Sequence, residues 1–282
     1  MSIQYRSFSQ QQLKLFKQYQ QKSYQTLEEA RSMLQVGDSE IKIARRLRKL
    51  FHQQGVHSYF HVPVVLFGKR TGYPGDFGAF EALATEHKLE KGMPVILDAA
   101  PIYDGYIVDT SLSFSFGDDE PYQAMYHQLK SFRKMILAMV KKGESFQIIE
   151  QAVNQKMQDI GAVNCHRKHI GEVLGHRIFN ESRQFWRKIT YKQLSLKHVL
   201  WLVWKSLATK KGWIFDSPNW NHRRTSDRPP AEGLWAVEPH FCIDGIGVKF
   251  EEILVIEKDN AYWLDDELPH SRTWEAYELG VK

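Results

Sequence analysis

The chain has 282 residues, of which 43% are hydrophobic, and its 38 Lys and Arg against 33 Asp and Glu give a formal net charge of +5. This composition is typical of a folded globular protein and excludes a disordered or fibrous one. The chain has no signal-peptide pattern, no apolar run near the roughly 18 residues that span a bilayer, and only two cysteines, so we expect a cytoplasmic protein without membrane spans or a disulfide scaffold.

The first recognisable element is a helix pair at residues 30–55. Gly37 is placed to end one helix, Ser39 to cap the start of a second, and Gly55 to end that second helix. Apolar residues recur at every fourth position from Ile43 to Phe51, which indicates one buried helix face. The pattern predicts two packed helices.

A β-hairpin follows at residues 93–116, marked by an Asp-Gly dipeptide. If its turn is centred on Tyr103–Asp104, Asp98 and Asp109 lie directly opposite each other. Two carboxylates so placed repel each other. Strand alternation predicts that Asp109 shares a polar face with Ser111, Ser113 and Ser115, opposite an apolar face made by Val108, Leu112, Phe114 and Phe116.

The helix pair is repeated 106 residues later, where residues 136–161 align without gaps on residues 30–55. Gly143, Ser145 and Gly161 take the places of the two glycines and the capping serine. A chance match of glycines and short apolar residues is the alternative. The repeat predicts a duplicated domain, with pseudo-twofold halves at about 1–118 and 119–282.

Residues 183–228 break this symmetry. They hold eleven Lys and Arg against two acidic residues, a formal charge of +9, and five of the eight tryptophans, while the rest of the chain carries −4. The spacing between the second helix pair and its hairpin exceeds the first by 34 residues, so we expect an insertion near the mouth of a cleft. Binding of nucleic acid by this basic, Trp-rich segment is a less favoured alternative.

A second hairpin at residues 234–256 turns on Asp244–Gly245. This register places Glu238 opposite Glu251 and turns Glu252 to the other face. A sheet keeps two pairs of opposed carboxylates only if a cation lies between them or one member of each pair is protonated. Four carboxylates from two hairpins therefore predict a site for two divalent metal ions.

These motifs resemble the pita-bread family of metallopeptidases, which includes methionine aminopeptidases, Xaa-Pro aminopeptidases, prolidases and the related creatinase. The resemblance runs from residue 30 to residue 264, apart from 183–228. It implies one catalytic domain over residues 1–282 with an α+β pita-bread fold, a curved antiparallel sheet covered by two helix pairs. The family's five metal-ligand positions match Asp98, Asp109, His176 after Gly175, Glu238 before Pro239, and Glu251; His166 and His169 are rivals for the histidine.

The resemblance also implies roles for these residues. Asp98 completes one metal site and His176 with Glu238 the other, while Asp109 and Glu251 bridge two ions. Mn, Co or Fe is favoured over Zn as the metal. Glu238 and His176 are the catalytic residues, and Glu238 transfers protons during the reaction. The implied activity is that of an aminopeptidase or dipeptidase on short peptides, with Xaa-Pro bonds favoured over removal of N-terminal Met. A homodimer is left open.

Two family histidines that help bind substrate are replaced, one by Phe80 and Glu81 and the other by Arg183. Two alternatives therefore remain: a pita-bread module that binds peptides or proteins without cleaving them, and a creatinase-like hydrolase of a small C–N substrate. Loop displacement could still bring another histidine to the site, the candidates being His61, His87 and His222.

Overall fold

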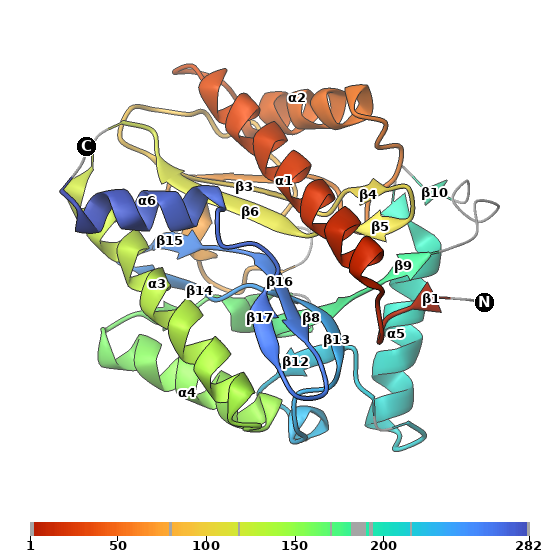
Figure 1. Cartoon of the computed structure of the whole chain (residues 1–282). Helices are drawn as coiled ribbons and strands as arrows, with labels where there is room; N and C mark the ends of the chain where they lie inside the picture. Colours follow the sequence, from red (N-terminus) through yellow and green to blue (C-terminus); the bar gives the residue numbers. More distant parts are fainter. Residues whose placement is uncertain are drawn as a thin grey trace.

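Helix pairs and runs of antiparallel strands follow one another along the chain in a computed structural model that describes residues 3–78, 81–117, 119–169, 171–181, 190–191, 194–214 and 216–280 (Figure 1). Every strand pair within this part of the chain is antiparallel. The predicted α+β class is confirmed. Among the described residues, no helix is both long and apolar enough to cross a membrane.

Both predicted helix pairs are present, as α1 (Gln10–Ser32) with α2 (Glu40–Gln53) and α3 (Glu120–Lys141) with α4 (Phe146–Asp159). The serine at the start of each second helix is a true N-cap, because Ser39 Oγ accepts from Lys42 N and Ser145 Oγ from Ile148 N. Gly143 follows α3 directly with a φ of 76°, in the left-handed region that favours glycine.

The end of α1 differs from the prediction. This helix is capped at Met33, four residues before Gly37, so Gly37 belongs to the connection and not to the helix end. The connection is held instead by a neighbouring segment, since Gly37 N donates to Leu89 O at 2.8 Å and Leu89 N donates to Asp38 O at 2.8 Å. Backbone pairing with distant residues thus fixes the connection after α1.

The first hairpin belongs to a sheet ordered β2 (Val64–Phe67), β3 (Pro94–Ala99) and β6 (Thr110–Ser115), and ends in β4 (Ile102–Tyr103) and β5 (Tyr106–Ile107). The predicted register is wrong. Asp98 pairs with Ser111, not with Asp109, because the turn lies on Asp104–Gly105, whose φ values are 48° and 89°. Two positive φ values at these positions make the hairpin turn that matches strand twist.

The faces of this hairpin are as predicted. Val108, Leu112 and Phe114 are buried in the apolar core, and Phe116 packs against it. The opposite face is buried as well, although it is polar, because the second half of the molecule covers it: Ser113 Oγ accepts from Lys249 N at 3.1 Å. Its buried members are Asp98, Asp109, Ser111, Ser113 and Ser115.

The second hairpin is built into a sheet ordered β12 (Asn219–Asn221), β8 (Val173–Ile178), β13 (Gly233–Val237), β16 (Glu252–Ile256) and β17 (Ala261–Trp263). The hairpin tip is formed by β14 (His240–Ile243) and β15 (Ile246–Lys249), and β7 (Val163–Asn164) pairs with β14. Val237 pairs with Glu252 and His240 with Lys249, so the predicted register, with Glu238 across from Glu251, is confirmed.

Two apolar cores lie on opposite faces of the β13–β16 pair. Leu234 and Ile253 belong to the core shared with α1 and α2, whereas Trp235 and Leu254 belong to the core shared with α3 and α4. Because both faces are buried, these strands read as continuous apolar runs. A further helix, α6 (Pro269–Glu278), joins the second core through Trp274.

The described parts of the basic segment form α5 (Leu196–Lys210), the strand pair β10 (Thr190–Tyr191) with β11 (Leu194–Ser195), and β12. Asp216 ties this segment to the body, because its carboxylate binds Arg177 at 3.0 Å and Arg6 at 3.1 Å. A small sheet of β1 (Ile3–Gln4), β9 (Asn180–Glu181), β5 and β4 links the N-terminal strand to the first hairpin (Figure 1).

Candidate metal centre

The two hairpins meet where an isolated bridge pairs Ser111 with Glu251. Since Asp98 pairs with Ser111 and the register places Glu238 opposite Glu251, the three carboxylates and Ser111 form one row across neighbouring strands. Directly paired residues point to the same face of a sheet, so this row is aimed at one place. Asp109 lies on the same face as Ser111, two residues before it.

His176 comes to this place from β8, which lies beside β13 and pairs His176 with Ala236. The preceding Gly175 is required by close packing, because a Cβ at this position would lie 2.5 Å from Ala236 O. This close approach gives the Gly-His element its physical reason: the small residue lets β8 sit near enough to β13 for the imidazole to face the carboxylates.

Lys249 supplies a cation between the carboxylates. Its Nζ lies 2.7 Å from Asp98 Oδ2, 3.0 Å from Glu238 Oε2 and 3.1 Å from Glu251 Oε2, and the side chain is 1% exposed. The three carboxylates outweigh the effect of burial and raise the pKa of Lys249 well above its usual value. A cation between the carboxylates or protonation of one of them was expected here. Lys249 was not named, although it stands two residues before Glu251 and so shares its strand face.

Two histidines stand behind Glu238. His169 Nδ1 lies 2.8 Å from Glu238 Oε2, and His169 Nε2 lies 3.0 Å from His240 Nδ1. His240 Nε2 in turn lies 2.7 Å from Thr71 O. Burial would raise the pKa of Glu238, but the charges of His169 and Lys249 hold it well below its usual range. Glu238 is thus an ionised carboxylate with one oxygen fixed from two sides.

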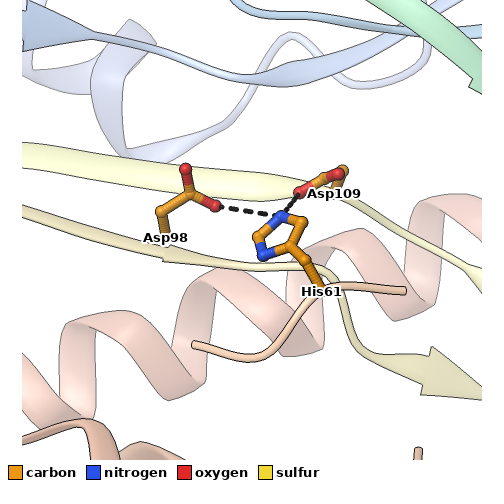
Figure 2. A group of neighbouring side chains, drawn as sticks. All are labelled: His61, Asp98 and Asp109. Atoms are coloured by element: carbon orange, nitrogen blue, oxygen red, sulfur yellow. Dashed lines mark hydrogen bonds and ion pairs between the residues drawn. The ribbon is translucent and has the colours of Figure 1, made fainter. Parts of the chain in front are cut away.

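Asp109 lies between two other histidines. His61 Nε2 is 3.0 Å from Asp109 Oδ1, and His176 Nε2 is 3.2 Å from Asp109 Oδ2. Figure 2 shows the His61 ring between the carboxylates of Asp109 and Asp98, with Asp98 Oδ1 at 3.5 Å. Burial alone would lower the pKa of His61, but the Asp109 and Asp98 carboxylates outweigh it and raise that pKa to about 10.

Glu251 has the opposite electrostatic environment. Burial, followed by the negative charge of Asp109, raises the pKa of Glu251 well above its usual value in spite of Lys249. Asp109 itself has a lowered pKa: burial would raise it, but His61 and His176 reverse the effect. Glu251 is therefore the carboxylate of the cluster that most lacks a balancing cation, which a bound metal ion would supply.

The donor geometry fits divalent ions. Two groups of residues each bring their ligand atoms within 4.8 Å of one another. One group is His61 with Asp98 and Asp109, and the other is Asp109 with His176 and Glu251. Asp98 Oδ1 is buried and has no hydrogen-bond partner in the described structure, an arrangement that is costly unless a cation completes it. Carboxylates with imidazole make a donor set for hard or borderline metals.

All five sequence-predicted ligands line one cavity of about 420 Å³, together with His61, His169 and Lys249. Its walls are largely apolar, from Phe60, Tyr73 and Phe77 to Val203 of α5, and Asn219 of β12 also reaches it. Residues of the basic segment therefore lie at the cavity. Glu238 is the one predicted ligand outside both donor groups, since one of its oxygens is held by His169 and Lys249.

The other candidate histidines lie away from the cavity. His222 Nε2 is 3.4 Å from Glu172 Oε2, and His166 Nε2 is 3.2 Å from the buried Glu150. His87 is not among the lining residues either. Phe80 and Arg183, which stand where the family has histidines, lie outside the described residues, and Glu81 Oε2 accepts from Gly78 N.

The family model of metallopeptidase family M24 matches residues 14–258. The chain belongs to this family. The resemblance inferred from the motifs is confirmed, and with it the α+β pita-bread fold. Membership implies divalent metal ions, for which the two donor groups are compatible sites.

Solved structures of similar fold include an X-Pro aminopeptidase from Thermotoga maritima, with a TM-score of 0.65, 18% identity, and coverage of 91% of this chain and 61% of that chain. A dipeptidase from Pyrococcus horikoshii has a TM-score of 0.64 and 16% identity, with coverage of 93% of this chain and 61% of that chain. A prolidase from Pyrococcus furiosus has a TM-score of 0.60 and 15% identity, with coverage of 93% of this chain and 64% of that chain. An uncharacterised peptidase of Methanocaldococcus jannaschii is 26% identical over 120 residues, 43% of this chain and 32% of that protein. The chain thus spans less than two thirds of the length of these relatives.

Proposed function

We propose that this M24 protein is a dinuclear metal-dependent aminopeptidase or dipeptidase that hydrolyses the N-terminal bond of short peptides, with Xaa-Pro bonds favoured over removal of Met. The observation that carries the proposal is the pair of donor groups sharing Asp109 at the base of one cavity. The names of the similar structures, an X-Pro aminopeptidase, a dipeptidase and a prolidase, support the choice of substrate.

In this proposal Asp98 would hold one ion, His176 with Glu238 would hold the other, and Asp109 with Glu251 would hold both. Bound divalent ions supply a nucleophile near neutral pH, by lowering the pKa of a water, and polarise the scissile carbonyl. The mix of carboxylate and imidazole favours Mn, Co or Fe, with Zn as the alternative.

The protein's own groups then hold and move protons. In this proposal Glu238 would accept a proton from the attacking water and deliver it to the leaving nitrogen. Its lowered pKa makes it a weak base, so the transfer depends on the acidity that bound ions give the water. His169 and Lys249 hold one oxygen of Glu238, at 2.8 and 3.0 Å, and so orient its carboxylate toward the cavity. His176 is held by the backbone of the next residue, with Nδ1 donating to Arg177 O at 3.3 Å.

The cavity suits a short, partly apolar substrate. Tyr73 and Phe77 stack with ring centroids 4.1 Å apart and form one wall, and Phe60 packs beside His176 on another. Such walls accept a proline ring by apolar burial. Lys168 also lines the cavity and can attract a substrate carboxylate, although its Nζ already donates to Tyr73 O and Gly75 O.

A metal assay with a substrate panel tests the proposal. Purified protein is loaded with Mn(II) or Co(II), its metal content is counted, and Xaa-Pro peptides, Met-Xaa peptides and creatine are offered with and without chelator. We expect two ions per chain and chelator-sensitive cleavage of Xaa-Pro peptides. Asp109→Asn should lose both metal and cleavage, while Asp259→Asn, in an exposed turn, keeps both.

The alternatives have their own signatures. Full metal content without cleavage of any peptide would leave the non-cleaving binding module, and turnover of creatine alone would identify a hydrolase of small C–N substrates. A homodimer and a cytoplasmic location stay predictions. Nucleic-acid binding stays the less favoured reading, since Arg223 pairs with Glu172 and Arg228 with Asp216.

A further inference from the structure

We propose that His61 is an additional metal ligand, so that each of the two ions has one imidazole and Asp109 bridges them. This inference rests on the proposed metal centre and adds a residue to it. His61 was one of three histidines that the sequence offered as substitutes for the family's substrate-binding ones. The structure gives it a different role, because its ring faces the carboxylates.

The backbone fixes the position of His61 from both sides. Before it, Phe60 N donates to Ala100 O at 2.9 Å, and Tyr59 forms a bridge with Pro101. After it, β2 begins at Val64, which pairs with Asp98 itself. His61 is therefore attached at both ends to the strand that carries Asp98, and its ring reaches the carboxylate cluster without any loop displacement.

Both histidine rings are oriented in the same way. His61 Nδ1 lies 3.0 Å from Val62 O, and His176 Nδ1 lies 3.3 Å from Arg177 O, in each case the carbonyl of the next residue. A carbonyl only accepts hydrogen bonds, so Nδ1 carries a proton in each ring. Nε2 shares a second proton with the carboxylates in the metal-free protein, and it is the nitrogen that would bind an ion in exchange for that proton. A backbone carbonyl that fixes the tautomer in this way is the usual support of a metal-binding histidine.

The distances agree with a shared ion. Ligand atoms bonded to one ion at about 2.1 Å lie about 3.0 to 3.4 Å apart for octahedral to tetrahedral angles. His61 Nε2 is 3.0 Å from Asp109 Oδ1 and 3.5 Å from Asp98 Oδ1. On the other side of Asp109, His176 Nε2 is 3.2 Å from Oδ2. The two oxygens of one carboxylate thus each face an imidazole, as a bridging carboxylate requires.

Of the two Asp98 oxygens, only one is already engaged. Lys249 binds Asp98 Oδ2 and leaves Oδ1, the atom near His61, buried without a hydrogen-bond partner in the described structure. An ion held by His61, Asp98 and Asp109 would satisfy this atom. The imidazole adds a nitrogen donor to a set that otherwise consists of oxygens, which shifts the preference of this site toward borderline ions such as Co(II), Fe(II) or Zn(II).

The test counts metal-bound histidines directly. Metal-free protein is titrated with Co(II), and the paramagnetically shifted, exchangeable ring N–H signals are recorded by NMR. We expect two such signals in the wild-type protein, one of them absent in His61→Ala and the other in His176→Ala. His61→Ala should also weaken one of the two Co(II) binding steps by on the order of 100-fold in calorimetry. His57→Ala, an exposed histidine on the same connection, is the matched control and should keep both signals.

The number of shifted N–H signals in the wild-type protein does not depend on how the variants fold. Circular dichroism checks that His61→Ala keeps its secondary structure. If the wild-type protein binds Co(II) but shows one signal, or if His61→Ala keeps every wild-type signal, the assignment of His61 is overturned and the proposed function stands. If the wild-type protein binds no Co(II), the proposed metal centre fails and the assignment fails with it.

Discussion

Lys249 offers the sharpest test of the electrostatics of this site. Its Nζ has three carboxylate partners at 2.7 to 3.1 Å, all at positions almost closed to water. At an effective dielectric of about 20, each contact at 3 Å has a gross attraction of about 5 kcal/mol, most of which is offset by desolvation of the ions. Replacing Lys249 by Met removes the cation, keeps the length of the side chain, and leaves three buried carboxylates facing one another.

We expect Lys249→Met to lower the free energy of unfolding by about 3 to 5 kcal/mol in the presence of chelator, as for other buried ion pairs that lose one partner. Saturating Mn(II) should shrink this difference to about 1 kcal/mol, because a bound divalent cation neutralises the same carboxylates and stabilises the folded state. Urea unfolding followed by tryptophan fluorescence measures both values.

Lys258→Met is the matched control, since Lys258 is exposed in the turn after β16 and should change stability by less than about 0.5 kcal/mol. If Lys249→Met in chelator unfolds within about 1 kcal/mol of the wild-type protein, Lys249 does not offset the repulsion, and the carboxylates must be relieved by protonation. An equal loss with and without Mn(II) would show that metal and ammonium act on different groups.

Three further outcomes follow from the structure. Burial would raise the pKa of Glu150, but the hydrogen bonds that it accepts from His166 and Arg167 lower this pKa to about 2, so the carboxylate stabilises the fold fully above its pKa in the unfolded chain, near 4.5. In urea titrations Glu150→Gln should therefore cost about 3 kcal/mol at pH 7. A stability difference between variant and wild type that stays constant as the pH falls from 4.5 toward 2 would contradict this. Asp216→Asn should lower the thermal midpoint in calorimetry, since it leaves buried Arg177 without its carboxylate, by an amount equivalent to about 2 to 3 kcal/mol; an unchanged midpoint would refute the structural role of this ion pair. Gly247→Ala should prevent the close packing at this position and so lower the thermal midpoint strongly, because its Cβ would lie 2.0 Å from a backbone oxygen. Gly280→Ala, in open space at a φ of +66°, is the control and should cost only about 1 kcal/mol in the same melting assay.

Local patterns in the sequence predicted much of this fold. The caps at Ser39 and Ser145, the glycine after α3 and the two Asp-Gly turns depend on a few neighbouring residues, and the structure has all of them. The register of the second hairpin also followed from its turn. The register of the first failed because the two aspartates were assumed to lie directly opposite each other, and this assumption displaced the turn by one residue.

The sequence by itself determined the family, the α+β class and the strand faces that carry the carboxylates, because caps, turns and strand alternation are local properties of the chain. Only the tertiary structure decided what lies between those carboxylates. His169 and His61 come from segments outside both hairpins, and their contacts with Glu238 and Asp109 arise when these segments pack against the hairpins. The contact of Lys249 with Asp98 likewise forms only when the two hairpins meet. Local patterns in a sequence do not show which buried charges meet across such distances, since each pairing is set by the packing of the whole fold.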